Sequence, residues 1–331
     1  MADLRTTITE VVTGLGMLGF DSVDAALAAR PDAFTNIEPS VYDDLQRAWK
    51  ERRDTHAFTA ALMNGLAFLH AEDALRHRVP ALVEWKGAHR APGDEVVPAD
   101  LRVDHVYLVS CKYLSRIVVN ASPHHLFDRL LAGGQGRRGS DWFREVAPAE
   151  YAQLYSAVRP IVDPSLPSEI ADLDVAQRRS LANALRGGWP DDAHEQYRIL
   201  ASTVATASAD RWNDAVRDAK EAMLWRLLRI GSAPYFVLGA SNDGFLRLRI
   251  GTPWDWRQAF ELRSFEVEAR AGGQPMVGWC AVVRDRAHAR ERVVEGHVEV
   301  RWSHGRFAAP PEAKVYLDTR HDEIPGYFPL K

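Results

Sequence analysis

A short stretch of strand-forming sequence carries the residues best suited to chemistry. Asp100 opens this stretch, and Ser110 and Lys112 close it, two residues apart. Side chains at positions i and i+2 of a strand project from the same face, so Ser110 and Lys112 share a face. Residues 98–112 have the pattern of two strands joined by a turn at 104–105, which places Asp100 beside Ser110 on the neighbouring strand.

Carboxylates and a lysine in this arrangement suit the hydrolysis of phosphodiesters. That reaction needs a divalent ion to activate water and offset the charge at phosphorus, and carboxylate oxygens are natural ligands for Mg²⁺ or Mn²⁺. Asp100 would be one metal ligand, and Glu84 would be the second if its strand, 81–86, pairs beside the Asp100 strand. Lys112 would orient or help to deprotonate the attacking water, which an arginine cannot do. Ser110 would be a weak ligand or would support one.

The stretch 98–112 resembles the signature of the PD-(D/E)xK nuclease superfamily, which has the restriction-endonuclease-like fold. In that signature an Asp opens one strand, and the next strand ends in an acid, any residue and a Lys. Ser110 stands where the family has Glu or Asp, and Glu84 would restore the missing oxygen. The resemblance implies a Mg²⁺- or Mn²⁺-dependent DNA endonuclease, with a role in restriction or phage defence.

Two arginine-rich segments provide candidate contacts to nucleic acid. Arginine side chains bind phosphate, and an aromatic ring or a histidine stacks on bases. The candidates are Arg301, Trp302, His304 and Arg306 in one turn, and Arg137 and Arg138 in a glycine-rich loop. The turn at 301–306 equally suits a structural hairpin with Trp302 in the core.

Two other functions fit the same residues. A non-catalytic nucleic-acid-binding or assembly subunit would keep the fold after losing catalysis, with Ser110 as the altered position. A structural partner protein would bind no nucleic acid, and Asp100 and Asp104 would then be ordinary turn residues. His124 and His125 begin a helix, and we expect no metal site there.

Hydrophobic periodicity predicts the elements that must hold these side chains. Residues 41–69 have the pattern of a helix, in which Gly65 is a weak point because Gly costs about 1 kcal/mol relative to Ala. Strands are expected at 81–86, 100–103 and 106–112.

The resulting fold class is a mixed α/β or α+β structure, with a restriction-endonuclease-like core, a helical elaboration and a β-rich C-terminal domain. Four consecutive blocks follow from the change of pattern along the chain: a helical lead at 1–40, a nuclease-like α/β core at 41–135, a helical region at 136–230 and a β-rich domain at 231–331.

Composition limits the classes of protein to consider. Of 331 residues, 46% are hydrophobic and 26% charged, and no apolar run approaches the roughly 20 residues that span a bilayer. We therefore expect a soluble, cytoplasmic protein. Cys111 and Cys280 lie far apart, which argues against zinc ribbons and disulfide scaffolds. The net charge of −4 provides no overall basic field, so DNA would be bound by a local patch. A homodimer or partner subunits of a defence system are expected, because cutting both strands of a duplex calls for two sites.

Overall fold

The protein is a mixed α/β structure, as its sequence predicts, with a seven-stranded sheet and a five-stranded sheet. The computed structural model describes residues 4–87, 98–113, 117–128, 141–241, 244–270 and 272–331. Contacts group the chain into two compact units: unit 1 comprises 1–116, 229–259 and 320–331, and unit 2 comprises 117–228 and 260–319. The four consecutive sequence blocks differ from this grouping because hydrophobic pattern reports local structure, whereas the chain leaves unit 1 and returns to it twice.

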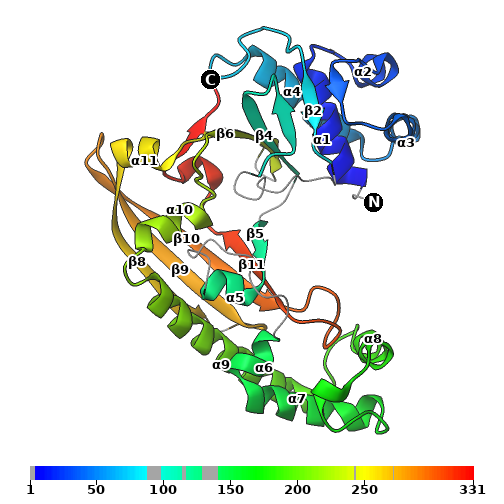
Figure 1. Cartoon of the computed structure of the whole chain (residues 1–331), viewed down its shortest axis with the longest axis vertical. Helices are drawn as coiled ribbons and strands as arrows, with labels where there is room; N and C mark the ends of the chain where they lie inside the picture. Colours follow the sequence, from blue (N-terminus) through cyan, green and yellow to red (C-terminus); the bar gives the residue numbers. More distant parts are fainter. Residues whose placement is uncertain (1–3, 88–97, 114–116, 129–140, 242–243, 271) are drawn as a thin grey trace. The chain divides into compact units, whose positions relative to one another are not determined.

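The helices of unit 1 lie mostly at its N-terminal end. They are α1 (Leu4–Met17), α2 (Val23–Ala29), α3 (Pro39–Lys50), α4 (Thr55–His70), α11 (Pro253–Ala259) and the short 3₁₀ helix η2 (His321–Glu323). The single helix expected at 41–69 is in fact α3 and α4, because Arg52 and Asp54 have φ angles of 57° and 51°, outside the helical range. Helices α1 and α4 pack side by side (Figure 1).

The sheet of unit 1 contains the predicted hairpin at its centre. Its strands, in spatial order, are β1 (Phe34–Thr35), β2 (Val83–Trp85), β3 (Leu101–Val103), β4 (Tyr107–Tyr113), β6 (Tyr235–Ser241), β7 (Gly244–Ile250) and β12 (Tyr327–Pro329). Strands β2, β3 and β4 form an antiparallel meander, and β6 runs parallel to β4. The turn residues Asp104 and His105 both have positive φ, and the Asp104 carboxylate accepts hydrogen bonds from the amides of Ala81 and Leu82. One face of the meander, with Val83 and Val109, is buried in the core that includes α1 and α4.

Unit 2 is an antiparallel sheet covered by helices. The sheet order is β5 (Ile117–Ala121), β11 (Glu312–Leu317), β10 (Arg290–Arg301), β9 (Met276–Asp285) and β8 (Phe260–Arg270). The helices are α5 (Pro123–Phe127), α6 (Trp142–Val146), α7 (Pro148–Val162), η1 (Ile170–Asp172), α8 (Val175–Ala184), α9 (Asp191–Val216) and α10 (Lys220–Leu227). The long helix α9 lies along β8 and β9 (Figure 1). Fully buried Trp212, Phe265 and Trp279 form part of the core of this unit.

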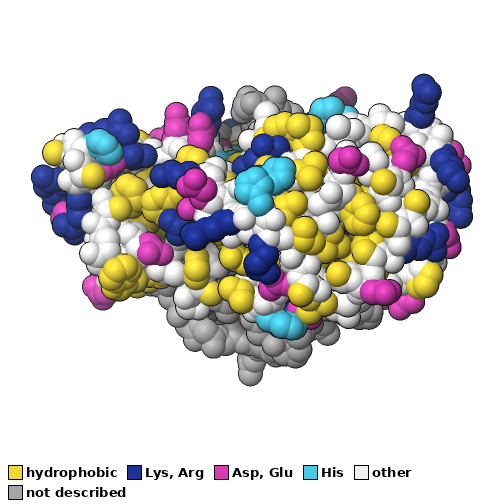
Figure 2. Space-filling model, turned by 90° about the horizontal axis from the view of Figure 1, so that it is seen from above, with side chains coloured by type: hydrophobic (Ala, Val, Ile, Leu, Met, Phe, Trp, Pro, Cys, Tyr) yellow, Lys and Arg dark blue, Asp and Glu magenta, His cyan; other side chains and the backbone are white. Residues whose placement is uncertain are grey.

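The surface carries mixed charge. On the face shown in Figure 2, Lys and Arg side chains lie among acidic and hydrophobic ones, in keeping with a net charge of −4. Within the described segments, no helix has both the length and the apolar character needed to cross a membrane.

Candidate active site

Asp100 lies beside Ser110, as the hairpin predicts. Its side chain is 8% exposed, and its Oδ2 accepts hydrogen bonds from the Cys111 amide at 2.7 Å and from the Ser110 hydroxyl at 3.2 Å. The Asp100 amide donates to the Val109 carbonyl at 2.8 Å, and the Lys86 amide donates to the Asp100 carbonyl at 3.0 Å. These bonds to both neighbouring strands hold the carboxylate at the end of the meander.

Lys112 follows Ser110 on the same face of β4 and is half-buried. Strand β3 begins at Leu101, which pairs with Val109, so no residue of β3 lies opposite Lys112. Burial raises the pKa of the Cys111 thiol well above its usual range, and a further increase comes from the charge of Asp100. The Lys112 ammonium acts on the same thiol and lowers that pKa. Asp100 accepts a hydrogen bond from the Cys111 amide and Lys112 is the next residue of the strand, so both lie near Cys111.

A second buried carboxylate, Glu10, lies on the face of the meander that packs against α1. Glu10 belongs to α1, is 8% exposed, and its Oε2 accepts a hydrogen bond from the Trp85 indole at 2.6 Å. Trp85 pairs with Leu101, which adjoins Asp100, and the charge of Glu10 also raises the pKa of the Cys111 thiol. Glu10 lies outside the motif at 98–112, and its only signal in the sequence is a glutamate beside Ile8, Val11 and Val12 in a helical pattern.

Glu84 is bound by a guanidinium group. Its Oε2 and Oε1 accept hydrogen bonds from Arg102 Nε at 2.6 Å and Nη2 at 2.7 Å, and His105 Nδ1 lies 3.2 Å from Oε2. The hydrogen bonds from Arg102 lower the pKa of Glu84. Strand register pairs Glu84 with Arg102 and not with Asp100, so Glu84 and Lys112 lie on opposite sides of the Asp100 position along the strands. Arg102 therefore binds both carboxylate oxygens of Glu84, the residue expected to be the second metal ligand.

Trp302 and Arg306 have structural contacts in unit 2. The Trp302 ring lies 4.7 Å from that of Phe143 and 5.2 Å from that of Phe307, within a larger aromatic cluster. Arg306 donates a hydrogen bond to the Leu185 carbonyl, and its guanidinium lies 4.7 Å from the centre of the Trp189 ring. These contacts favour the structural interpretation of the turn at 301–306.

Arg301 and His304, two further nucleic-acid candidates, lie beside acidic side chains. Arg301 pairs with Glu299 at 3.0 Å, and exposed His304 lies 3.5 Å from Glu312. Both line a cavity of about 580 Å³, whose other basic side chains are Arg186, Arg306 and Lys314. Arg137 and Arg138 lie outside the described residues.

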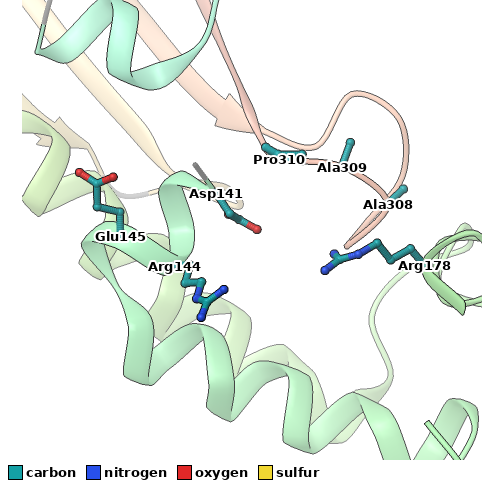
Figure 3. Close-up of a pocket in the computed structure, with 7 residues that line it drawn as sticks. All are labelled: Asp141, Arg144, Glu145, Arg178, Ala308, Ala309 and Pro310. Atoms are coloured by element: carbon teal, nitrogen blue, oxygen red, sulfur yellow. The ribbon is translucent and has the colours of Figure 1, made fainter. Parts of the chain in front are cut away.

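A second cavity of unit 2, of about 630 Å³, is shown in Figure 3. Asp141 is at its edge, caps α6 and accepts a hydrogen bond from the Tyr151 hydroxyl at 3.0 Å, while burial raises the pKa of Asp141. Arg178 donates to the Ile170 and Phe307 carbonyls at 2.7 and 3.0 Å. The polar groups of this cavity thus hold loops and a helix end in place.

No family model, curated protein or solved structure matches this chain.

Proposed function

We propose that this protein is a metal-dependent nuclease that hydrolyses phosphodiester bonds of DNA, with Asp100 at its centre. The supporting observation is that the buried Asp100 carboxylate is held against Ser110 and Cys111, on the strand that carries Lys112. The order of helix α4, strand β2 and hairpin β3–β4 adds support, because the resemblance to the PD-(D/E)xK superfamily depends on it.

Each side chain has a proposed role. Asp100 would hold Mg²⁺ or Mn²⁺, and Glu10 would supply the second hard oxygen donor by reaching Asp100 around the ends of β2 and β3, since these ions prefer carboxylate oxygens. The bound ion would activate water and stabilise the charge that develops at phosphorus. Lys112 orients the attacking water and exchanges a proton with it, and the Ser110 hydroxyl positions Asp100 Oδ2. Glu84 is the alternative second ligand, which must first leave Arg102.

DNA is the proposed substrate, and the cytoplasm is the proposed location, where restriction or defence against phage would take place. Because cutting both strands of a duplex calls for two sites, we propose that the chain acts as a homodimer or with partner subunits.

Incubation of the purified chain with duplex and single-stranded DNA, in Mg²⁺, Mn²⁺ or EDTA, tests the proposal. Lys112→Arg keeps the charge but not the geometry, so cleavage should fall by roughly 10²–10⁴-fold in a folded variant. Asp100→Asn should abolish cleavage and leave DNA binding equal or tighter, because a negative charge near phosphate is removed. Full activity of Lys112→Arg, or loss of DNA binding by Asp100→Asn, would contradict these roles.

A matched pair of variants identifies the second ligand. Glu10→Gln and Glu84→Gln each remove one carboxylate at nearly constant size. We expect Glu10→Gln to abolish cleavage and Glu84→Gln to retain most of it, because Arg102 already neutralises Glu84. The opposite result would assign the metal to Glu84.

The alternative is a non-catalytic nucleic-acid-binding subunit. The Glu84–Arg102 pair favours it, because the acid expected to compensate for Ser110 is engaged elsewhere. This alternative predicts that the wild-type chain binds DNA without cutting it in either metal and that Asp100→Asn changes nothing. If the chain does not bind DNA at all, a structural partner protein is the remaining function.

A further inference from the structure

Three side chains of different types converge in unit 2. His124 belongs to α5, Asp128 caps the end of that helix four residues later, and Glu145 belongs to α6. His124 Nδ1 lies 3.2 Å from Asp128 Oδ2, and His124 Nε2 lies 3.0 Å from Glu145 Oε2. Within the described segments, this is the one set of three or more His, Cys, Asp or Glu side chains whose ligand atoms all lie within 4.8 Å of one another.

The histidine ring is held by the core beneath it. The edge of the His124 ring meets the Trp142 ring, with 4.7 Å between centroids at an interplanar angle of 89°. Trp142 is fully buried, and its indole N–H donates to the Ser208 hydroxyl at 3.0 Å. Figure 3 shows the Glu145 carboxylate turned away from Arg144 and Arg178, in keeping with its contact to His124. A ligand whose orientation is fixed by packing is the basis of a preorganised metal site.

The guanidinium group of Arg211 lies against the carboxylates of Asp128 and Glu145. Arg211 Nη1 is 2.6 Å from Glu145 Oε1 and 3.5 Å from Asp128 Oδ2. The side chains of His124, Asp128 and Glu145 are 20–34% exposed, and that of Arg211 is 37% exposed. A dissolved ion therefore has access to the carboxylates, and the guanidinium has solvent into which it can withdraw.

We propose that His124, Asp128 and Glu145 bind a divalent transition-metal ion, with zinc strongly preferred over magnesium, and that Arg211 competes with this ion. One imidazole nitrogen with two carboxylate oxygens is a donor set that suits zinc, whereas magnesium prefers oxygen alone. Ligands about 2.1 Å from a tetrahedral zinc lie roughly 3.4 Å apart. Because Asp128 faces Nδ1 and Glu145 faces Nε2 of the same ring, one of the two carboxylates must swing toward the other nitrogen when the ion binds. Three protein ligands leave one coordination position for water.

Zinc titration of the untagged, metal-free chain tests this proposal, with a chromophoric chelator as competitor and Co²⁺ absorption as a report of coordination. His124→Ala should weaken zinc binding by more than about 100-fold, because even an outer-shell change costs 10–100-fold. His125→Ala, at the neighbouring position, should bind zinc as the wild type does. His77→Ala is a second control, because His70 and His77 form a stacked imidazole pair in unit 1.

Asp128→Asn keeps the size of the side chain and tests the site if His124→Ala does not fold. Equal zinc stoichiometry and affinity in the wild type, His124→Ala and Asp128→Asn would overturn the site. Arg211→Met removes the competing cation and should tighten zinc binding by roughly tenfold. Unchanged or weaker zinc binding by Arg211→Met would show that Arg211 does not compete with the ion. These outcomes are independent of DNA cleavage, since the site shares no residue with the Asp100 cluster.

Discussion

Gly65→Ala should destabilise unit 1, although alanine is the better helix former. A Cβ at Gly65 of α4 would lie 2.1 Å from the Thr13 carbonyl oxygen and 2.7 Å from the Gly16 Cα of α1. Carbon and oxygen normally approach to about 3.3 Å, so the two helices must separate by roughly 1 Å. Both contacts are to backbone atoms, and no rotamer change relieves them.

The expected magnitude follows from two opposing effects. In an isolated helix Ala would gain about 1 kcal/mol over Gly. Overpacking a well-packed core costs typically 1–3 kcal/mol, occasionally more, and an overlap with backbone belongs at the upper end. We expect a net loss of about 2 kcal/mol, which lowers the melting temperature of a unit of this size by roughly 4–8 °C. Because α1 carries Glu10, cleavage of DNA should fall as well.

Differential scanning calorimetry of the full chain measures this change in the transition of unit 1. Gly187→Ala is the matched control, since a Cβ at Gly187 meets no atom within 4 Å. The control should melt with the wild type. A Gly65→Ala variant that melts at or above the wild-type temperature would refute the close approach of α1 and α4, because helix propensity alone predicts that result.

Three further perturbations test individual contacts. Glu84→Gln removes a carboxyl group whose pKa is lowered by Arg102. The ionised carboxylate stabilises the fold above pH 4.5, and this contribution is lost as the pH falls through the lowered pKa. The free energy of unfolding in urea should therefore decrease less steeply at acid pH in the variant than in the wild type. Asp285→Asn should cost unit 2 about 1–3 kcal/mol by calorimetry, because Asp285 is 3% exposed and pairs with the partly exposed Arg292 at 2.6 Å. Trp302→Ala should lower the free energy of unfolding by about 3 kcal/mol and leave DNA binding by the folded chain unchanged. Weaker DNA binding at unchanged stability would instead indicate that Trp302 stacks on bases.

Local features of the structure followed from the sequence. The hairpin of β3 and β4 was predictable because alternation, turn residues and a short connection act within about a dozen residues. The neighbourhood of Asp100 and Ser110 followed from the same register. The mixed α/β class followed in the same way from the change of periodicity along the chain.

Longer-range partners came only from the tertiary structure. The sequence pattern places Glu84 on a strand, but only the register of β2 against β3 shows that Glu84 pairs with Arg102. Glu10 meets Trp85 of β2 because α1 packs on the sheet, and periodicity does not specify which buried helix meets which strand. Asp128 follows His124 by four residues and was visible in the sequence, whereas Glu145 lies beside them because Trp142 of α6 packs against His124 and Phe127 of α5. Such contacts depend on the summed burial of many side chains, so no short sequence window encodes them.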